Sequence, residues 1–166
     1  MRKVEPKIRL ATEADLPAIN DIYNYYVLNS TCTFQTEPET SEDRARWFAL
    51  HDELHPVTAA EIQGQVVGWA SLSRYHARSA YRHTVEDSVY VREDLRSHGI
   101  GTALLKDLVE RAKQLGHHSI VATISADQTG SIELHRRFNF LEAGHIREAG
   151  RKFDRWLDVI LMQKML

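Results

Sequence analysis

The sequence of 166 residues contains a single cysteine, four prolines and no long hydrophobic run. Because Cys32 has no second cysteine to pair with, an internal disulfide and a cysteine-based zinc site are both excluded. No stretch approaches the roughly 18–20 consecutive apolar residues that a membrane-spanning helix needs. The first residues, Met1 to Pro6, lack the apolar centre of a signal peptide. We therefore expect a cytoplasmic protein with no membrane partner.

The sequence also lacks an excess of basic residues. Lysine and arginine total 21 against 23 aspartates and glutamates, which gives a formal net charge of -2. Because proteins that bind nucleic acid normally carry a basic surplus, we expect no nucleic-acid partner. The 43% hydrophobic and 27% charged residues are typical of a folded protein. The length suits one domain over residues 1–166, with a core at about 7–165.

Alternating strand and helix patterns predict a mixed α/β fold. Apolar residues at helical spacing predict helices that begin after Thr12 and after Ser41, the second running toward Pro56. Two further helices are expected at 100–116 and 131–138. Strands are expected at 7–11, 57–62, 65–73, 84–91, 118–124, 142–148 and 156–164. This order predicts a mixed, mostly antiparallel sheet flanked by helices.

The segment from Thr84 to Gly116 carries the clearest functional signal. A strand runs into the turn Arg96-Ser97-His98-Gly99-Ile100-Gly101, and that turn opens a helix. The first turn of a helix has unpaired backbone N–H groups and the positive end of the helix dipole, so it can bind a pyrophosphate. Gly99 and Gly101 allow a ligand to approach the backbone closely. With a carboxylate, Glu86, on the preceding strand, the segment indicates an enzyme.

The turn differs from two common nucleotide-binding motifs. It lacks the Gly-x4-Gly-Lys-Ser/Thr pattern of the P-loop, which argues against nucleotide hydrolysis. It also lacks the third glycine and the downstream acidic residue of a dinucleotide-binding fold. Taken alone, Gly-x-Gly fits an ordinary helix start equally well.

The turn resembles that of the GNAT superfamily of N-acetyltransferases, whose pyrophosphate turn reads Arg/Gln-x-x-Gly-x-Gly/Ala. Arg96, Gly99 and Gly101 match this pattern position for position. The resemblance narrows to the phosphinothricin/methionine sulfone acetyltransferase family through four more segments. These are Thr33-Phe34-Gln35-Thr36-Glu37-Pro38 and residues 81–86, 131–135 and 152–159. The resemblance covers about residues 7–165.

The resemblance implies a GNAT fold in which two central strands splay apart and hold acetyl-CoA. It implies direct acetyl transfer in a ternary complex, without a metal, to the α-amino group of phosphinothricin, methionine sulfoximine or methionine sulfone. It also implies a homodimer. The implied acetyl-CoA-binding residues are Val89, Tyr90, Val91, Arg96, Ser97, His98, Gly99, Ile100, Gly101, Thr102, Gln128 and Ser131. Gln128 stands where the family usually has Asn, and Asn139 where it usually has Gly.

Two residues are candidates for proton transfer. Glu86 is the candidate base, acting through a water, and burial in the cleft would raise its pKa into a useful range. The alternative is that Glu86 pairs with Arg78 or Arg82. His135 occupies the position of a family histidine that is proposed as an acid or base, and a purely structural role fits it equally well. No tyrosine lies at 129–140 to take the acid role.

The resemblance also implies an acceptor site. Arg78, Ser79, Ala80 and Tyr81 align with the family's recognition loop, and a guanidinium can hold a carboxylate or phosphinate bidentately. Glu86 would face the acceptor as well. Phe34 and Trp156 are expected apolar walls, with plain core packing as the alternative. Lys152 and Asp158 are interpreted as an ion pair at a strand end.

Other activities fit parts of the same pattern. An enzyme of the same fold could acetylate a polyamine, an aminoglycoside or a protein N-terminus, although Arg78 and Arg82 favour an anionic acceptor. A binding module could sense acyl-CoA without turning it over. His51 and His55, four residues apart on the second predicted helix, could hold zinc, but a solvated helix face is the favoured interpretation. We expect no metal.

Overall fold

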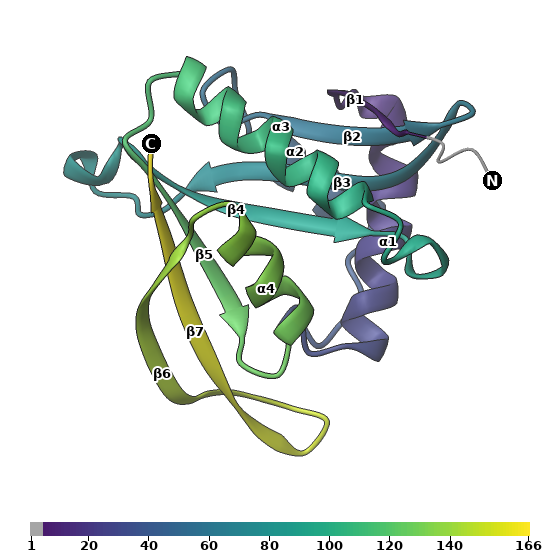
Figure 1. Ribbon diagram of the computed structural model, residues 1–166. Coiled ribbons are helices and arrows are strands. Elements are labelled where there is room, and N and C mark those ends of the chain that lie inside the picture. Colours follow the sequence, from purple (N-terminus) through teal and green to yellow (C-terminus); the bar gives the residue numbers. More distant parts are fainter. Residues whose placement is uncertain (1–4) are drawn as a thin grey trace.

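The computed structural model describes residues 5–166. The predicted lack of a signal peptide rests partly on the first four residues, which lie outside the described residues. A seven-stranded sheet in the order β1-β2-β3-β4-β5-β7-β6 forms the centre (Figure 1). Its strands are β1 (Lys7–Leu10), β2 (Val57–Ile62), β3 (Gln65–Arg74), β4 (Thr84–Val91), β5 (Ser119–Ser125), β6 (Leu141–Lys152) and β7 (Arg155–Met165). The helices are α1 (Leu16–Asn29), α2 (Ser41–Ala49), α3 (Ile100–Gln114) and α4 (Thr129–Arg137).

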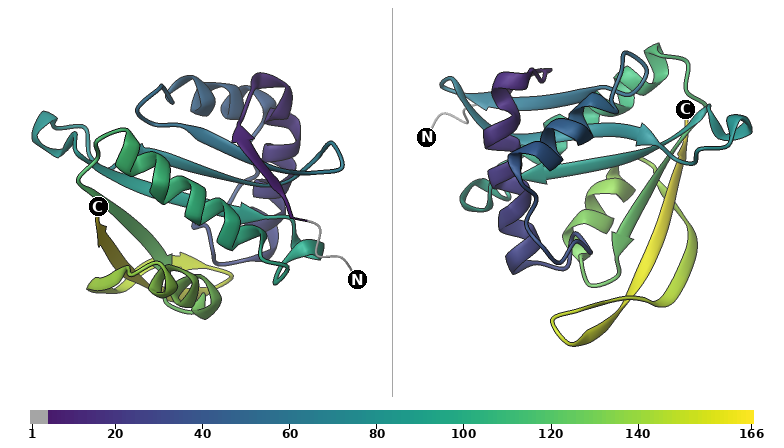
Figure 2. Two further views of the ribbon diagram at one scale, coloured as in Figure 1. Left: turned by 45° about the horizontal axis from the view of Figure 1, so that its top comes forward. Right: turned by 180° about the vertical axis from the view of Figure 1, so that it is seen from behind.

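Helices cover both faces of the sheet. Helices α1 and α2 lie on one face, and α3 and α4 lie on the other, as the opposite views in Figures 1 and 2 show. Leu104, Leu105 and Leu108 of α3 are fully buried against the sheet, whereas Ile19 of α1 packs with Trp69 on the other face. Burial of apolar side chains on both faces is the main force that holds these layers together. The predicted α/β class is confirmed.

The sheet is antiparallel except at its centre, where β4 and β5 run parallel. These two strands pair at only three positions, the last of which joins Glu86 and Val121. Beyond that point β4 continues to Val91 beside β3, while β5 continues to Ser125 beside β7. The strands therefore splay apart, as predicted, and one edge of β4 loses its strand partner.

The C-terminal hairpin is longer than predicted. A two-residue turn at Phe153 and Asp154, both at positive φ, joins β6 to β7. Such paired positive φ values are typical of the type I′ turn, whose twist matches antiparallel strands. The prediction ended this strand at residue 148, whereas β6 continues to Lys152 beyond a register shift between Ile146 and Gly150. This bulge breaks the alternation of apolar and polar residues on which the prediction depended.

Helix α2 begins and ends differently from its prediction. Thr40, not Ser41, is the N-cap, because its hydroxyl accepts a hydrogen bond from the Asp43 N–H while the Asp43 carboxylate accepts one from the Thr40 N–H. The helix ends at Ala49, well before Pro56.

The shorter helix removes the predicted histidine pair. His51 and His55 lie in the loop after α2, so the expectation that both lie on one helix is wrong. The Asp52 carboxylate accepts hydrogen bonds from the backbone N–H groups of Leu54 and His55, which stabilises a turn in place of a further helical turn. The His51 ring instead contacts the Ser73 hydroxyl at 3.1 Å.

Gly68 on β3 gives a test of how α3 packs on the sheet. A Cβ at this position would lie 2.9 Å from the Tyr90 carbonyl oxygen and 3.1 Å from a methyl group of Leu104. Gly68→Ala should therefore reduce the free energy of unfolding by about 1–3 kcal/mol, measured by urea denaturation. The control is Gly144→Ala, because a Cβ there would lie 3.6 Å from Leu161 in ordinary contact. Equal stability of the two variants would contradict the packing described.

Candidate active site

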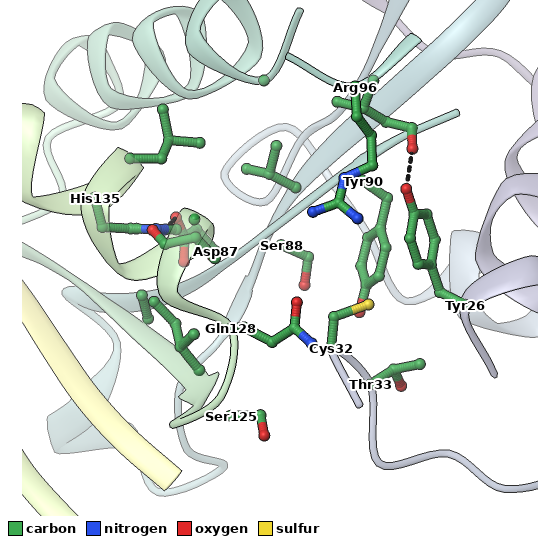
Figure 3. Close-up of a pocket in the computed structure, with 18 of the residues that line it drawn as sticks. Tyr26, Cys32, Thr33, Asp87, Ser88, Tyr90, Arg96, Ser125, Gln128 and His135 are labelled. Atoms are coloured by element: carbon green, nitrogen blue, oxygen red, sulfur yellow. Dashed lines mark hydrogen bonds and ion pairs between the residues drawn. The ribbon is translucent and has the colours of Figure 1, made fainter. Parts of the chain in front are cut away.

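The splay of β4 and β5 opens a cleft of about 520 Å³. Its walls come from the exposed edge of β4, the turn before α3, the start of α4 and the loop after α1 (Figure 3). The lining combines carboxylates, hydroxyls, amides and apolar side chains. Such a cleft has the size and mixed lining of a small-molecule site.

The turn between β4 and α3 presents a row of backbone donors. Ser97 and Gly99 have left-handed backbone conformations, with φ of 63° and 86°. Between residues 5 and 166, no acceptor receives a hydrogen bond from the backbone N–H groups of residues 97–102; the Ala103 N–H is the first to bond, to the Gly99 carbonyl. Unpaired N–H groups at a helix N-terminus form a binding site for an anion such as a pyrophosphate. The turn therefore fits the ligand that the sequence predicts.

The structure brings most of the predicted acetyl-CoA-binding residues to the cleft. Val89, Tyr90 and Val91 line it from β4, and all but two of the others line it from the turn and from α4. The exceptions are His98, which is exposed, and Ile100, which is buried in the core. These two residues can contribute their backbone N–H groups only.

Tyr26 was not predicted, yet it organises the edge of β4. Its hydroxyl donates a hydrogen bond to the Val91 carbonyl, drawn as a dashed line in Figure 3. Burial raises the pKa of Tyr26, so the phenol keeps its proton and remains a donor. In the sequence, Tyr26 is one of several apolar residues at helical spacing, and nothing distinguishes it from a core residue.

Gln128 is held with its carbonyl oxygen toward the cleft. Its amide nitrogen donates to the Thr31 hydroxyl at 2.8 Å, and the Thr31 hydroxyl donates to the Asp127 carboxylate at 2.8 Å. Figure 3 shows the Gln128 side chain projecting into the cleft toward Ser88. The glutamine that replaces the usual asparagine therefore still offers a hydrogen-bond acceptor to a ligand. Asn139, at φ 61°, adopts the left-handed conformation expected of it.

Glu86 lies half-buried in the cleft at the point where β4 and β5 separate. Burial, aided by the negative charge of Asp87, raises the pKa of Glu86. Within the described residues Glu86 forms no ion pair, so the alternative partners Arg78 and Arg82 do not engage it. A carboxylate in this setting can accept a proton.

His135 forms a buried pair with Asp87, a residue that was not predicted. The Nε2 atom lies 2.8 Å from the Asp87 carboxylate, and Nδ1 lies 2.7 Å from the Ser131 carbonyl oxygen. Burial alone lowers the pKa of His135, but the charge of Asp87 and these hydrogen bonds raise it overall. Because both ring nitrogens face acceptors, the protonated imidazolium is the form that both contacts satisfy.

The alternation of residues along the predicted strand 84–91 could have indicated that Asp87 is buried. Val85 and Asp87 point to the same, buried face of β4. A carboxylate at a core-facing position requires a partner, because an unpaired buried charge is strongly unfavourable. The sequence did not identify that partner, since His135 lies 48 positions away.

The predicted acceptor residues divide into two groups. Phe34 and Glu86 line the cleft. Arg78, Ser79, Ala80 and Tyr81 form an exposed turn beyond β3 and are not part of the cleft lining in the described chain. Trp156 is 61% exposed, with the Arg151 guanidinium 5.7 Å from its ring.

The predicted ion pair between Lys152 and Asp158 is wrong. The Lys152 ammonium is buried and donates to the backbone carbonyls of Ser30 and Thr33, at 2.6 and 2.8 Å. Asp158 instead accepts hydrogen bonds from the His145 ring and the Glu148 N–H. The β6–β7 register explains the difference, because it places Lys152 opposite Arg155.

Two further observations concern membranes and metals. Between residues 5 and 166, every helix is too short or too polar to cross a membrane. Among the same residues, no group of three His, Cys, Asp or Glu side chains is arranged to hold a metal ion.

Comparison with known proteins identifies the family of the chain. The family model described as "Acetyltransferase (GNAT) family" matches residues 19–140, and the chain therefore belongs to this family. Acetyl-CoA is the co-substrate of the family.

Individual relatives match nearly the whole chain. An L-methionine sulfoximine/L-methionine sulfone acetyltransferase of Pseudomonas paraeruginosa is 42% identical, over 94% of this chain and 92% of that protein. A phosphinothricin acetyltransferase of Sinorhizobium meliloti, solved with AcCoA, is 37% identical with a TM-score of 0.94, over 98% of this chain and 89% of that chain. A structure described as ribosomal-protein-alanine N-acetyltransferase from Brucella melitensis is 42% identical with a TM-score of 0.94, covering 96% and 99%.

The buried pair of His135 and Asp87 predicts a pH-dependent stability. The pKa of His135 is raised in the folded state. The stabilisation that the protonated ring gives to the fold is therefore complete below about pH 6.5, the ordinary pKa of histidine, and is lost as the pH rises through the raised pKa. His135→Gln should reduce the free energy of unfolding by about 3 kcal/mol at low pH, with a smaller reduction at high pH.

The measurement is urea denaturation of both proteins at about pH 6 and about pH 9. The control is His145→Gln, because the His145–Asp158 pair has the same 2.8 Å separation but is exposed, so its loss should change the stability little at either pH. A difference between wild type and His135→Gln that does not change with pH would contradict the description of the pair.

Proposed function

We propose that this protein transfers the acetyl group of acetyl-CoA to the α-amino group of a small amino-acid-like substrate, with phosphinothricin, methionine sulfoximine and methionine sulfone as the candidate acceptors. The observation that carries the proposal is the position of Glu86, which is half-buried where β4 and β5 separate and forms no ion pair with any residue from 5 to 166. The names of the Pseudomonas and Sinorhizobium relatives support the acceptor class.

Acetyl-CoA supplies a thioester carbonyl that an amine can attack directly. The backbone N–H groups of residues 97–102 would bind its pyrophosphate, and the edge of β4 at Val89, Tyr90 and Val91, beyond its pairing with β5, would hold the pantetheine arm. A backbone N–H of this edge, such as that of Val89, would stabilise negative charge on the carbonyl oxygen. Acceptor and donor would meet in one ternary complex.

The acceptor amine must lose a proton before it can attack, because only the neutral amine is a nucleophile. Glu86, through a bridging water, would take that proton. Burial matters here because it raises the pKa of Glu86 and so makes the carboxylate a stronger base. No covalent intermediate with the protein is needed.

The contacts of His135 favour a positioning role over that of an acid. Both ring nitrogens contact protein acceptors, the Asp87 carboxylate and the Ser131 carbonyl oxygen. To protonate the departing thiolate, the ring would have to release one of these partners. We therefore propose that His135 holds Asp87 and the start of α4 in place beside the cleft.

The recognition loop suits an anionic acceptor. Arg78 and Arg82 are exposed close to the start of β4, the strand that carries Glu86. Guanidinium groups bind carboxylates and phosphinates well, and cationic polyamines poorly. A homodimer, which the family resemblance implies, is part of this proposal, and so is the cytoplasmic location that the sequence composition predicts.

A protein N-terminus is the second candidate acceptor. The Brucella structure, described as a ribosomal-protein-alanine N-acetyltransferase, is as similar to this chain as the Pseudomonas relative in sequence identity. A free α-amino group is common to both acceptor classes, so the same base would serve both reactions.

The first test is CoA release from acetyl-CoA with methionine sulfoximine, methionine sulfone, phosphinothricin, an alanine-initiated peptide and spermidine as acceptors. We expect turnover with the amino acids alone. Glu86→Gln should reduce kcat by about 100-fold or more, because it removes the base but keeps the shape of the side chain. Acetyl-CoA affinity should stay unchanged. Turnover confined to the peptide or to spermidine would refute the acceptor assignment.

The pH dependence separates Glu86 from the acceptor amine. In the wild type, two groups must lose a proton before reaction at low pH: the acceptor amine and Glu86. Because the pKa of Glu86 is raised, the deprotonation of Glu86 falls within the pH range in which the enzyme can be assayed. The slope of log(kcat/KM) against pH should therefore approach about two below that pKa, but stay near one in Glu86→Gln. Equal slopes would show that Glu86 is not the base.

A further inference from the structure

One wall of the cleft includes Phe34, whose ring contacts a residue far away in the sequence. Phe34, on the loop after α1, lines the cleft, and its ring packs directly on the backbone of Gly150 in β6. A Cβ built on Gly150 would lie 2.5 Å from Cε2 of the Phe34 ring. Because real Cβ atoms do not approach other atoms so closely, any side chain at position 150 would displace this ring.

The backbone of Gly150 does not itself require glycine. The glycines at positive φ are Gly64, Gly99 and Gly116 among the described residues, and Gly150 is not one of them. An alanine could therefore adopt the backbone conformation at position 150 without strain. The contact with Phe34 is the physical reason for a missing side chain at this position.

The loop that carries Phe34 cannot shift to relieve such a clash, because Lys152 fixes its backbone to the same strand. The buried ammonium donates to the carbonyls of Ser30 and Thr33, on either side of Cys32, and lies 3.5 Å from the Tyr26 carbonyl at the end of α1. The three N–H donors of an ammonium match these three acceptors. The cation also lies favourably at the negative end of the α1 dipole.

The rest of the loop is anchored as well. The Thr31 hydroxyl bonds to Asp127, and Glu39 forms a 2.7 Å ion pair with the buried Arg44 guanidinium. That guanidinium lies 4.5 Å from the centre of the Trp47 ring, in cation–π contact. With the loop held before and after Phe34, the ring, which lines the cleft, would have to rotate away from β6.

We propose that Gly150 is a specificity-determining residue for the acceptor, acting through Phe34, and that Lys152 is the positioning residue that makes this contact rigid. The missing side chain at position 150 keeps the Phe34 ring against β6 and leaves the acceptor space open. This inference rests on the proposed function, because it assigns this end of the cleft to the acceptor and the turn at residues 97–102 to acetyl-CoA.

The test is steady-state kinetics of Gly150→Ala with methionine sulfone and phosphinothricin as acceptors. We expect the acceptor KM to rise by about tenfold or more, while the KM for acetyl-CoA changes by less than about twofold. Gly144→Ala is the matched control, because it makes the same change on the same strand with only a 3.6 Å contact to Leu161. The urea midpoint of each variant reports whether the fold is retained.

A double-mutant cycle keeps the test decisive if Gly150→Ala folds poorly. In a Phe34→Ala background the Cγ, Cδ2 and Cε2 atoms that the new Cβ would meet are absent, so Gly150→Ala should change the acceptor KM by less than about twofold. An unchanged acceptor KM in Gly150→Ala, an equal rise in both KM values, or an effect that persists in Phe34→Ala would each overturn the inference. If the wild type turns over no amino acid, the proposed function fails, and the inference fails with it.

Discussion

The separation of β4 from β5 after Glu86 is the constraint on which the rest of the structure depends. Each strand keeps its other neighbour: β4 stays with β3 as far as Val91, and β5 stays with β7 as far as Ser125. The sheet therefore divides into two halves that share only three paired positions. Unpaired backbone groups must find other partners or face a ligand, so this gap determines where a binding site can form.

Polar side chains around the gap are held by contacts that reach across the fold. Tyr26 of α1 bonds to the Val91 carbonyl at the end of β4, and His135 of α4 bonds to Asp87 near the point of separation. Each contact places a helix against the exposed half of β4. The walls of the cleft are thus held by contacts within the protein itself.

Local patterns in the sequence predicted most of the elements and the glycine-bearing turn before α3 well. Helical spacing identified α1 and α3, and Gly99 with Gly101 identified the turn, because the features that define them lie within a few residues. The end of α2 was wrong because Asp52 stabilises a competing turn that helical spacing does not reveal. The predicted strand 142–148 was too short for a similar reason, because a bulge between Ile146 and Gly150 interrupts the alternation along β6.

Contacts between distant residues could not be predicted in the same way. The pairing of Asp87 with His135 spans 48 positions, and Lys152 reaches carbonyls about 120 positions earlier in the chain, which helical and strand periodicity cannot report. The family resemblance pointed to Glu86, His135 and Phe34 as site residues. It did not point to the residues that position them. Those positioning residues become visible only when the register of β6 and β7 and the path of the loop after α1 are known.

The most direct test of the central claim is amide hydrogen exchange, followed by NMR, with and without acetyl-CoA. If the splayed edge and the turn form the acetyl-CoA site, the backbone N–H groups of residues 97–102 should exchange more slowly in the complex, and signals of Val89, Tyr90 and Val91 should shift. Amides of β1 and β2 should remain unchanged. Tight binding of acetyl-CoA without protection at residues 97–102 would contradict the account.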